Sequence, residues 1–200
     1  MLYGTTFGVF GAGSCASGGC GTVFRITTGG NERPLLQFSG APNGADPFGG
    51  LTVVKGVLYG TTLYGGKNDA GSLFSITTKG TEKVMYSFGA NAYDCVNPYA
   101  QLLEYGGSFY GTTAAGGDYG FGTAFRINSK TGKEVWSYSF DAPGGHDGVD
   151  PYSGLVELGG VLYGTTSSGG RNAQGTVFKL TTSGKETPLE PARRHSVGPV

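Results

Sequence analysis

Few residues in the sequence have the types and spacing that catalysis needs. His146 stands beside Asp147, a pair that could supply a general base and its orienting carboxylate. One such pair is not a catalytic triad, and His195 lies in a region where the sequence pattern has been lost. The sequence therefore predicts no catalytic residues and no cofactor, and it favours a non-enzymatic protein without deciding the question.

An acidic or amide residue precedes proline at three positions, Asp46, Asn97 and Asp150. A ring of such side chains could bind calcium, whereas the simpler interpretation is a turn that leads into the proline. The stretch DGVDP, which ends in Pro151, lacks the alternating ligands and the terminal glutamate of a calcium loop. We therefore favour the turn and predict no metal site.

Two cysteines lie close together in the stretch CASGGC, at Cys15 and Cys20. A disulfide in an oxidising compartment, two free thiols and a metal site are the alternatives. A metal site would need further cysteine or histidine ligands, and none lies nearby in the sequence. The disulfide is favoured, and the state of Cys95 is left open.

Composition excludes two classes of partner. The formal net charge is zero and only 14% of the residues are charged, so the basic stripe of a nucleic-acid-binding protein is missing. No apolar run reaches the roughly 18 residues that a membrane-spanning helix needs. The 40 glycines are accompanied by 12 tyrosines and 12 phenylalanines, which is enough apolar surface for a core.

A repeat with a period slightly above 50 residues organises the chain. The motif Tyr-Gly-Thr-Thr begins at Tyr3, Tyr59, Tyr110 and Tyr163. Each copy is followed by a Gly-Thr-Val-Phe-like motif and then by a segment that opens with glutamate. This period is the size of a four-stranded propeller blade, whereas the coils of a β-solenoid are usually shorter.

Each repeat divides into four short apolar segments that alternate like strands, and the first two are joined by a glycine-containing two-residue turn. We therefore expect an all-β fold of four-stranded antiparallel blades of the β-propeller type, about 51–53 residues each, with a kelch-like layout and forming a partial ring. A single repeat domain should cover 1–189, and the remaining 190–200 should be poorly ordered. The expected units are a partial blade at 1–38 and blades at 47–88, 98–140 and 151–189.

The glycine of Tyr-Gly-Thr-Thr would weaken a strand, so its recurrence needs a cause. We expect an aromatic side chain of the next blade to pack over it. The alternative, a ligand-binding motif present in four copies, is less favoured because a ring needs the same tight contact once in each blade.

A meander of four strands brings two kinds of variable loop to one end of every blade. Ligand-binding residues often lie on such loops, and tyrosine together with acidic, amide and arginine side chains is a mixture that can bind sugars, although ordinary solvated loops contain the same residues. The candidate binding residues are Asn68, Asp69, Asp94, Tyr99, Asp118, Tyr119, His146, Asp147, Asp150, Tyr152, Arg171 and Asn172.

The stretch PYSGLVELGGVLYGTTSSGGRNAQGTVFKLTTSGKE at Pro151–Glu186 resembles the bacterial GloVer tandem-repeat proteins, also named choice-of-anchor proteins. Weaker copies make the resemblance extend over roughly 1–189. It implies a secreted or surface-anchored bacterial protein and brings no catalytic residues. Because the chain opens directly on a repeat motif, with neither signal peptide nor anchor, we expect it to be part of a longer protein, and export rests on the resemblance and the cysteine pair.

Three functions are consistent with these observations. The favoured one is a binding or interaction module at the cell surface, whose partner would be a carbohydrate or another surface protein. The alternatives are a propeller enzyme, such as a glycosidase or lyase, and a purely structural array. Two carboxylates about 5–9.5 Å apart in a pocket would favour the glycosidase, whereas an aromatic-lined surface would favour binding.

Overall fold

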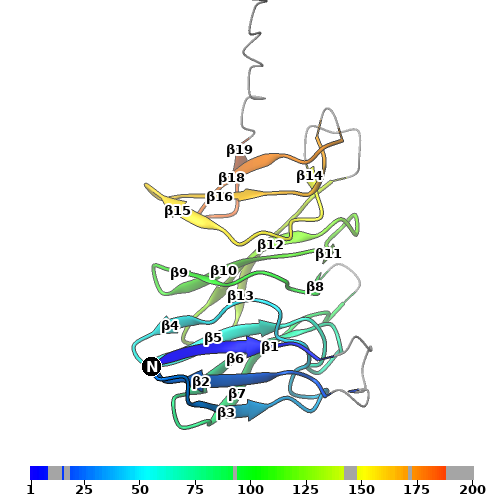
Figure 1. Cartoon of the computed structure of the whole chain (residues 1–200). Helices are drawn as coiled ribbons and strands as arrows, with labels where there is room; N and C mark the ends of the chain where they lie inside the picture. Colours follow the sequence, from blue (N-terminus) through cyan, green and yellow to red (C-terminus); the bar gives the residue numbers. More distant parts are fainter. Residues whose placement is uncertain (9–14, 16–18, 92–93, 142–147, 171–172, 188–200) are drawn as a thin grey trace, which may run out of the picture.

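The computed structural model describes residues 1–8, 15, 19–91, 94–141, 148–170 and 173–187. These residues form four main antiparallel sheets that follow one another along the chain, which we call blades 1 to 4 (Figure 1). Within the described residues no helix is long and apolar enough to span a bilayer. The prediction of an all-β repeat fold is confirmed.

The strands of each blade are paired in chain order. Blade 1 contains β1 (Leu2–Thr6), β2 (Thr22–Ile26) and β3 (Glu32–Gln37). Blade 2 contains β4 (Thr52–Val54), β5 (Val57–Thr62), β6 (Ser72–Thr77) and β7 (Glu82–Ser87). Blade 3 contains β9 (Leu103–Tyr105), β10 (Ser108–Thr113), β12 (Thr123–Asn128) and β13 (Glu134–Ser139). Blade 4 contains β15 (Val156–Leu158), β16 (Val161–Thr165), β18 (Val177–Thr181) and β19 (Glu186–Thr187).

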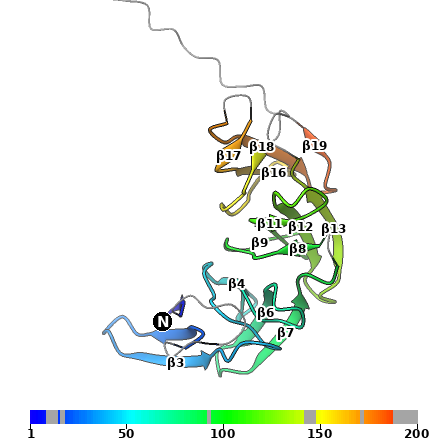
Figure 2. The same ribbon diagram turned by 90° about the vertical axis from the view of Figure 1, so that its right-hand side faces the viewer.

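The blades follow an arc. Figure 2 shows β4 and β9 on its inner side and β7 and β13 on its outer side. The first two strands of blades 2 to 4 are joined by two-residue turns, and Gly106 and Gly107 show why glycine is used there, because their φ angles are +57° and +74°. Such turns match the twist of paired strands, so the predicted hairpins form.

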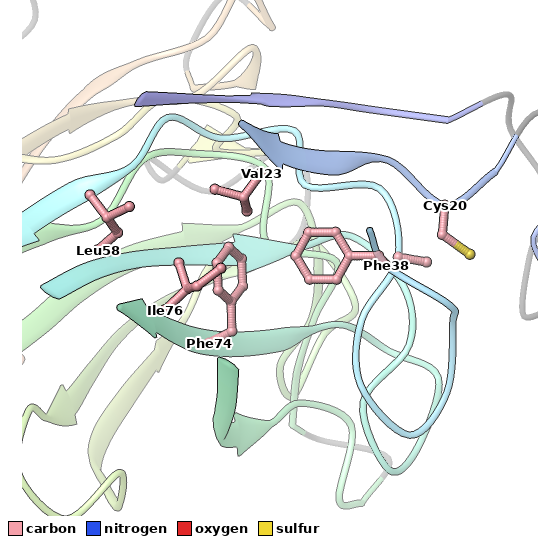
Figure 3. Packing of buried hydrophobic residues seen from close by; sticks show 7 residues of the cluster. Cys20, Val23, Phe38, Leu58, Phe74 and Ile76 are labelled. Atoms are coloured by element: carbon pink, nitrogen blue, oxygen red, sulfur yellow. The ribbon is translucent and has the colours of Figure 1, made fainter. Parts of the chain in front are cut away.

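The core lies between blades. Successive side chains of a strand point to opposite faces of its sheet. In β6 and β12, one set of side chains therefore contacts the preceding blade and the other set contacts the following blade. Between blades 1 and 2, Val23 and Phe38 of the former meet Leu58, Phe74 and Ile76 of the latter, as Figure 3 shows. Two further clusters of described residues repeat this arrangement between blades 2 and 3 and between blades 3 and 4.

One phenylalanine pair recurs at each of these interfaces. The ring of Phe38 meets that of Phe74 edge-on at a centroid distance of 5.1 Å. The corresponding distances are 5.3 Å for Phe88 with Phe125 and 4.9 Å for Phe140 with Phe178. Edge-to-face packing is a favourable geometry for aromatic rings.

The glycine of Tyr-Gly-Thr-Thr is needed for close approach, but the expected partner was wrong. A Cβ at Gly111 would lie 2.5 Å from Cζ of Phe125, and one at Gly60 would lie 2.8 Å from Cζ of Phe74. Both phenylalanines belong to the neighbouring strand of the same blade and lie directly opposite the glycine. Because the glycine has no side chain, the phenylalanine opposite it has room for its ring, which packs against the preceding blade.

The two threonines of the motif have different roles. The hydroxyl of the second, as in Thr113, pairs with Thr123 at 2.7 Å and donates to the carbonyl of Ala115 at 2.9 Å, which fixes the loop of its own blade. The first threonine donates to a backbone carbonyl of the next blade. These bonds join Thr5 to Gly49 at 3.2 Å, Thr61 to Ala100 at 3.4 Å and Thr112 to Ser153 at 2.7 Å.

The residue before each repeated proline joins two blades. Asn97 has a φ angle of +57°, donates its backbone N–H to the carbonyl of Ala70 in blade 2 and accepts from the N–H of Ala114 in blade 3. Asp46 and Asp150 make the same pair of backbone bonds between their own blades. We call this arrangement the clasp. The side chains of Asp46 and Asn97 add bonds to the preceding blade, accepting from the N–H of Gly8 and donating to the carbonyl of Leu63, both at 2.9 Å.

Candidate functional site

Two sets of loops share one end of the blades, which we call the loop face. The connections between blades span 38–51, 88–102 and 140–155 in the sequence, and the loops after Tyr-Gly-Thr-Thr span 7–21, 63–71, 114–122 and 167–176, of which the structure describes the parts given above. β8 (Cys95–Val96) of one set pairs with β11 (Ala115–Gly116) of the other, and β14 (Gly148–Val149) pairs with β17 (Ser168–Gly169). The expected meeting of these loops is therefore observed.

An uninterrupted series of aromatic rings lies on this face. Phe48, Tyr99 and Tyr152 each follow the repeated proline, so every connection contributes one ring. The ring centroids of Phe48 and Tyr99 are 5.5 Å apart, and those of Tyr99 and Tyr152 are 5.0 Å apart. Both pairs meet edge-on. Phe7 of blade 1 extends the series, with its ring centroid 5.5 Å from that of Phe48. We call these four residues the aromatic row.

The rings are accessible. Phe7 is 56% exposed, Phe48 is 48% exposed and Tyr152 is 50% exposed. Tyr99 is half-buried between its neighbours, and burial together with the nearby Tyr152 and Tyr64 raises the pKa of its hydroxyl. The hydroxyl therefore stays protonated at neutral pH and can donate a hydrogen bond.

The backbone under the row is held at both sides. The clasp fixes the residue before the proline. The first threonine of the preceding blade's Tyr-Gly-Thr-Thr motif donates to the backbone carbonyl of the residue two positions after the proline. Few backbone motions remain for the residue between them. A surface that is fixed before a ligand arrives loses less conformational entropy on binding.

An open depression of about 460 Å³ adjoins the row at its blade 4 end. Its walls combine apolar side chains with the amide of Gln101, which donates to the carbonyl of Leu51 at 3.0 Å. The lining residues are Ala100, Gln101, Leu102, Leu103, Tyr152, Gly154, Leu155 and Val156.

The polar residues predicted for this face are placed less uniformly. Asn68 donates to the carbonyl of Phe88 at 3.0 Å, and Asp69 accepts from the N–H of Gly65 at 2.9 Å, so both stabilise their own surroundings. Asp118 and Tyr119 are exposed on the blade 3 loop, and Asp150 is half-buried in its clasp. His146, Asp147, Arg171 and Asn172 lie outside the described residues.

Asp94 is buried in a polar cluster between blades 2 and 3, whose other members Tyr86 and Glu134 are half-buried. The hydroxyl of Tyr86 lies 3.2 Å from Oδ1 of Asp94 and 2.8 Å from Oε2 of Glu134. Asp94 also accepts from the backbone N–H groups of Ala90 and Cys95, at 2.6 and 2.7 Å. Burial, the bond to Glu134 and the charges of both carboxylates raise the pKa of Tyr86, which keeps the bridging proton in place.

The thiol of Cys95 completes this cluster. Among the described residues, Asp94, Cys95 and Glu134 are the group of potential metal ligands whose donor atoms all lie within 4.8 Å of one another. Burial raises the pKa of Cys95 to about 12, so the thiol is protonated at neutral pH and is a poor nucleophile. The two carboxylates share one tyrosine hydroxyl inside an interface, which is the arrangement of a structural network rather than of a glycosidase pocket.

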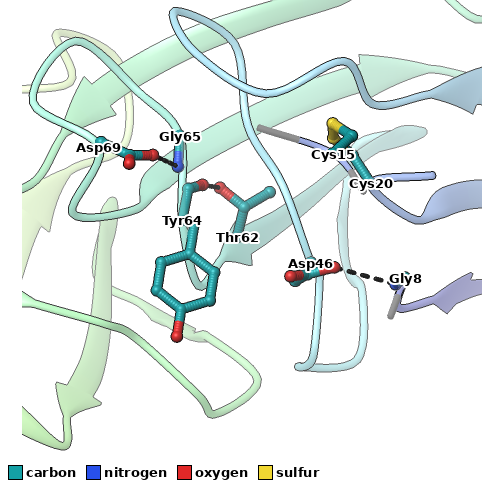
Figure 4. The surroundings of a disulfide bond; sticks show 8 residues. All are labelled: Gly8, Cys15, Cys20, Asp46, Thr62, Tyr64, Gly65 and Asp69. Carbon is teal, nitrogen blue, oxygen red and sulfur yellow. Dashed lines mark hydrogen bonds between the residues drawn. A yellow bond between two sulfur atoms is a disulfide. The ribbon is translucent and has the colours of Figure 1, made fainter. Parts of the chain in front are cut away.

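Cys15 and Cys20 form a disulfide on the loop face of blade 1, close to the bond between Gly8 and Asp46 (Figure 4). Cys20 is buried, and its carbonyl accepts the N–H of Asp46 at 2.8 Å. The disulfide therefore places Cys15 beside the first clasp.

The candidate residues predicted from the sequence include two of the four residues of the aromatic row. These two are Tyr99 and Tyr152, whereas Phe48 and Phe7 are absent from that set because an apolar ring in a sequence resembles a core residue. The signal was present, since an aromatic residue follows the repeated proline in all three connections.

Comparison with known proteins gives a family match and a group of similar folds. The family model described as the Gloeobacter/Verrucomicrobia repeat matches residues 1–192. A search of curated protein sequences finds no significant match. BamB from Moraxella catarrhalis has a TM-score of 0.51 at 15% identity, with 82% of this chain and 43% of that chain covered. The quinohemoprotein alcohol dehydrogenase ADHIIG from Pseudomonas putida HK5 has a TM-score of 0.54 at 15% identity, with 84% and 31% covered. Both likenesses show a β-propeller fold, and this chain spans less than half the length of either protein.

Proposed function

The chain belongs to the Gloeobacter/Verrucomicrobia repeat family, and we propose that it is a non-catalytic module that binds a glycan chain along the aromatic row. The observation that carries this proposal is the row itself, in which successive blades place exposed rings next to one another on a rigid backbone.

The chemistry of the row suits a neutral carbohydrate. The faces of sugar rings carry C–H groups that pack against aromatic rings, and the hydroxyls of Tyr99 and Tyr152 can exchange hydrogen bonds with sugar hydroxyls. A chain with zero formal net charge has no bulk attraction for a strongly charged polymer. An extended ligand could contact rings from several blades at once.

A location outside the cytoplasm is part of the proposal. The disulfide between Cys15 and Cys20 supports it, because such bonds persist in oxidising compartments. Alkylation of native, exported protein should label neither cysteine, and Cys95 should react only after unfolding because it is buried. Labelling of Cys15 and Cys20 in unreduced protein would contradict this location.

Binding is tested on a glycan array, followed by calorimetry with the best ligand. The double variant Phe48→Ala/Tyr152→Ala should lose most of the affinity, because it removes the two exposed rings on either side of Tyr99. The matched control is Tyr105→Ala, which removes a 40% exposed ring beside the turn at the opposite end of blade 3. Equal binding by the wild type and the double variant, or no glycan bound at all, would refute the proposal.

The same samples address the enzymatic alternative. Among the described residues, the carboxylate pair of Asp94 and Glu134 is bridged by Tyr86, so we expect no release of reducing sugar from any glycan that binds. Release of sugar by the wild type that survives in the double variant would place a catalytic site elsewhere.

A further inference from the structure

Positive charge gathers at the end of the blades opposite the loop face. We call this end the turn face, because it is formed by the turn between the first two strands of a blade and the turn between its last two strands. Figure 1 shows the hairpin ends of β9 and β15 on this side, away from β8, β11 and β14. The exposed cations at or beside the described turns, which we call the basic set, are Arg33, Lys55, Lys79, Lys83, Lys130, Lys133 and Lys185.

The aspartates lie at the other end of the blades. Every aspartate that the structure describes belongs to a loop of the loop face, and these residues are Asp46, Asp69, Asp94, Asp118, Asp141 and Asp150. Lys67 is the only arginine or lysine in the described part of the same loops. The zero formal net charge of the sequence therefore conceals a separation of charge along the direction of the strands.

Glutamates also lie at the turn face, but most of those described are half-buried and bound within the protein. Glu104 and Glu157 each accept the backbone N–H of a turn glycine, at 3.2 and 2.6 Å. Glu134 accepts the tyrosine hydroxyl of the cluster described above, and Oε1 of Glu82 is buried. Glu32 is the exposed glutamate among the described side chains of this face. The exposed cations therefore outnumber the exposed carboxylates.

The backbone that carries the basic set is held in place by neighbouring blades. A Cβ at Gly80 would lie 2.7 Å from the carbonyl oxygen of Leu35, and Gly132 packs in the same way against Met85. The turn between the last two strands of blades 2 and 3 therefore lies against the outer strand of the preceding blade. The hairpin ends are open, since a Cβ at Gly56 would have nothing within 4 Å. The lysines thus extend into open space from a fixed backbone.

We propose that the turn face binds the surface of a bilayer that contains anionic lipids. A lysine close to an anionic headgroup layer strengthens binding about fivefold. The basic set is spread over successive blades, so it matches an extended surface better than a single small ligand. The separation of charge orients the molecule, because the aspartates of the loop face would be repelled by the same surface. Bound in this way, the protein holds the aromatic row away from the bilayer.

The side chains of the turn face favour a headgroup layer over a nucleic acid. Sites for single-stranded nucleic acids add aromatic rings on which successive bases stack. Among the described residues of the turn face, Tyr105 is the exposed ring, and it is 40% exposed. One tyrosine among lysines suits the boundary between lipid and water, where tyrosine is enriched.

Co-sedimentation of the 200-residue chain with vesicles tests the proposal. The probes are vesicles of phosphatidylcholine alone and vesicles of phosphatidylcholine mixed equally with phosphatidylglycerol. The wild type should bind the mixed vesicles and should bind phosphatidylcholine alone far more weakly. Salt should release it, because the Debye length falls from about 10 Å at 0.1 M to about 3 Å at 1 M ionic strength.

Neutral substitutions locate the binding surface. The triple variant Lys79→Gln/Lys130→Gln/Lys133→Gln should lower the partition coefficient about a hundredfold, because three lysines are lost at about fivefold each. The matched single variants are Lys130→Gln and Lys67→Gln, which remove one exposed lysine each and have the same net charge. Lys130→Gln should weaken binding about fivefold, whereas Lys67→Gln, on the loop face, should bind like the wild type.

Four outcomes would overturn the proposal. Equal binding of the wild type to both kinds of vesicle would show that anionic headgroups are not recognised. Wild-type binding by the triple variant, or equal losses in the two single variants, would show that the turn face is not the binding surface. Binding of soluble polyphosphate without binding of mixed vesicles would make the partner a polymer instead of a bilayer.

Discussion

The interface between blades 2 and 3 and the interface between blades 1 and 2 share two contacts and differ at their outer strands. Both bury a pair of edge-on phenylalanines, and in both a threonine hydroxyl of the earlier blade donates to a backbone carbonyl of the later one. The difference concerns a side-chain hydrogen bond. At the later interface Tyr86 bonds to Glu134 at 2.8 Å.

At the earlier interface leucine takes the place of that tyrosine. Leu36 pairs with Val23 as Tyr86 pairs with Leu73, and Glu82 pairs with Ile76 as Glu134 pairs with Ile127. Oε1 of Glu82 is buried, and no donor among the described residues reaches it. Burial raises the pKa of this carboxyl. The phenylalanine pair and the threonine hydrogen bond are therefore present at both interfaces, whereas the polar contact between the outer strands varies. Where that contact is missing, a buried carboxylate oxygen without a donor lowers the stability of the fold.

The largest effect should come from the shared apolar pair. Phe125→Ala and Phe74→Ala should each lower the free energy of unfolding by about 3–5 kcal/mol, because each empties a fully buried ring site. Urea denaturation measures both. Phe24→Ala is the control, and its cost should be smaller because that ring is half-buried. A much smaller loss for Phe74→Ala than for Phe125→Ala would show that the two interfaces do not depend equally on the phenylalanine pair.

The polar contact of the later interface should come next. Tyr86→Phe should lower the free energy of unfolding by about 1–3 kcal/mol, because the half-buried carboxylate of Glu134 loses the tyrosine donor, whereas Asp94 keeps its two backbone donors. Tyr105→Phe removes a hydroxyl from a 40% exposed side chain and should change stability by less than about 0.5 kcal/mol. Equal effects of the two substitutions would show that the bridge contributes nothing.

The threonine bond should have a moderate effect that depends on whether a next blade is present. Thr61→Val and Thr112→Val should each cost about 0.5–1.5 kcal/mol, since valine keeps the shape and loses the donor. Thr165→Val, at the uncovered end, should stay within about 0.5 kcal/mol of the wild type. The same urea measurements at low protein concentration decide this, and three equal losses would argue against a role between blades.

The smallest effect should be a gain at the earlier interface. Leu36→Tyr should raise the free energy of unfolding by about 0.5–1 kcal/mol, because it restores the missing donor for Glu82. The corresponding change on the solvent side, Val135→Tyr, should be neutral. A loss of stability on Leu36→Tyr would show that the leucine is required for packing.

The pH dependence of the free energy of unfolding gives a second test of the buried carboxyl of Glu82. A raised pKa in the folded state means that the folded protein binds the proton of Glu82 more tightly, so its contribution to stability is greatest at low pH and is lost as pH rises through the raised value. The variant Glu82→Gln should therefore gain stability relative to the wild type over that range. A constant difference between the two unfolding curves across pH would contradict the assignment.

Much of this architecture could be predicted from the sequence, because the same strand patterns and turn residues recur in each repeat. The four segments of a blade and the glycine-containing hairpins all follow from periodicity and turn chemistry. The partner of the glycine in Tyr-Gly-Thr-Thr was misassigned because a strand pattern does not reveal whether a close neighbour belongs to the same sheet or to the next one.

The candidate binding surface was harder to predict for a physical reason. Single polar residues such as Asn68 and Asp69 look like ligand contacts in a sequence, yet their bonds to Phe88 and Gly65 become visible only in three dimensions. Phe48 looks like a core residue until the loop that carries it is found on a surface. The exposed carboxyl groups and rings of a loop cannot be assigned to a site before their neighbours are known.

The placement of one aromatic ring after each repeated proline has a consequence for how such proteins change over time. Duplication of a single repeat would insert one blade and lengthen the aromatic row by one ring, with the backbone under it already held by the next clasp. Affinity for a polymeric ligand would then rise by avidity with each added copy, without any new contact having to be invented. If the aromatic row binds a glycan as proposed, the number of repeats would be an inherited way to adjust binding strength.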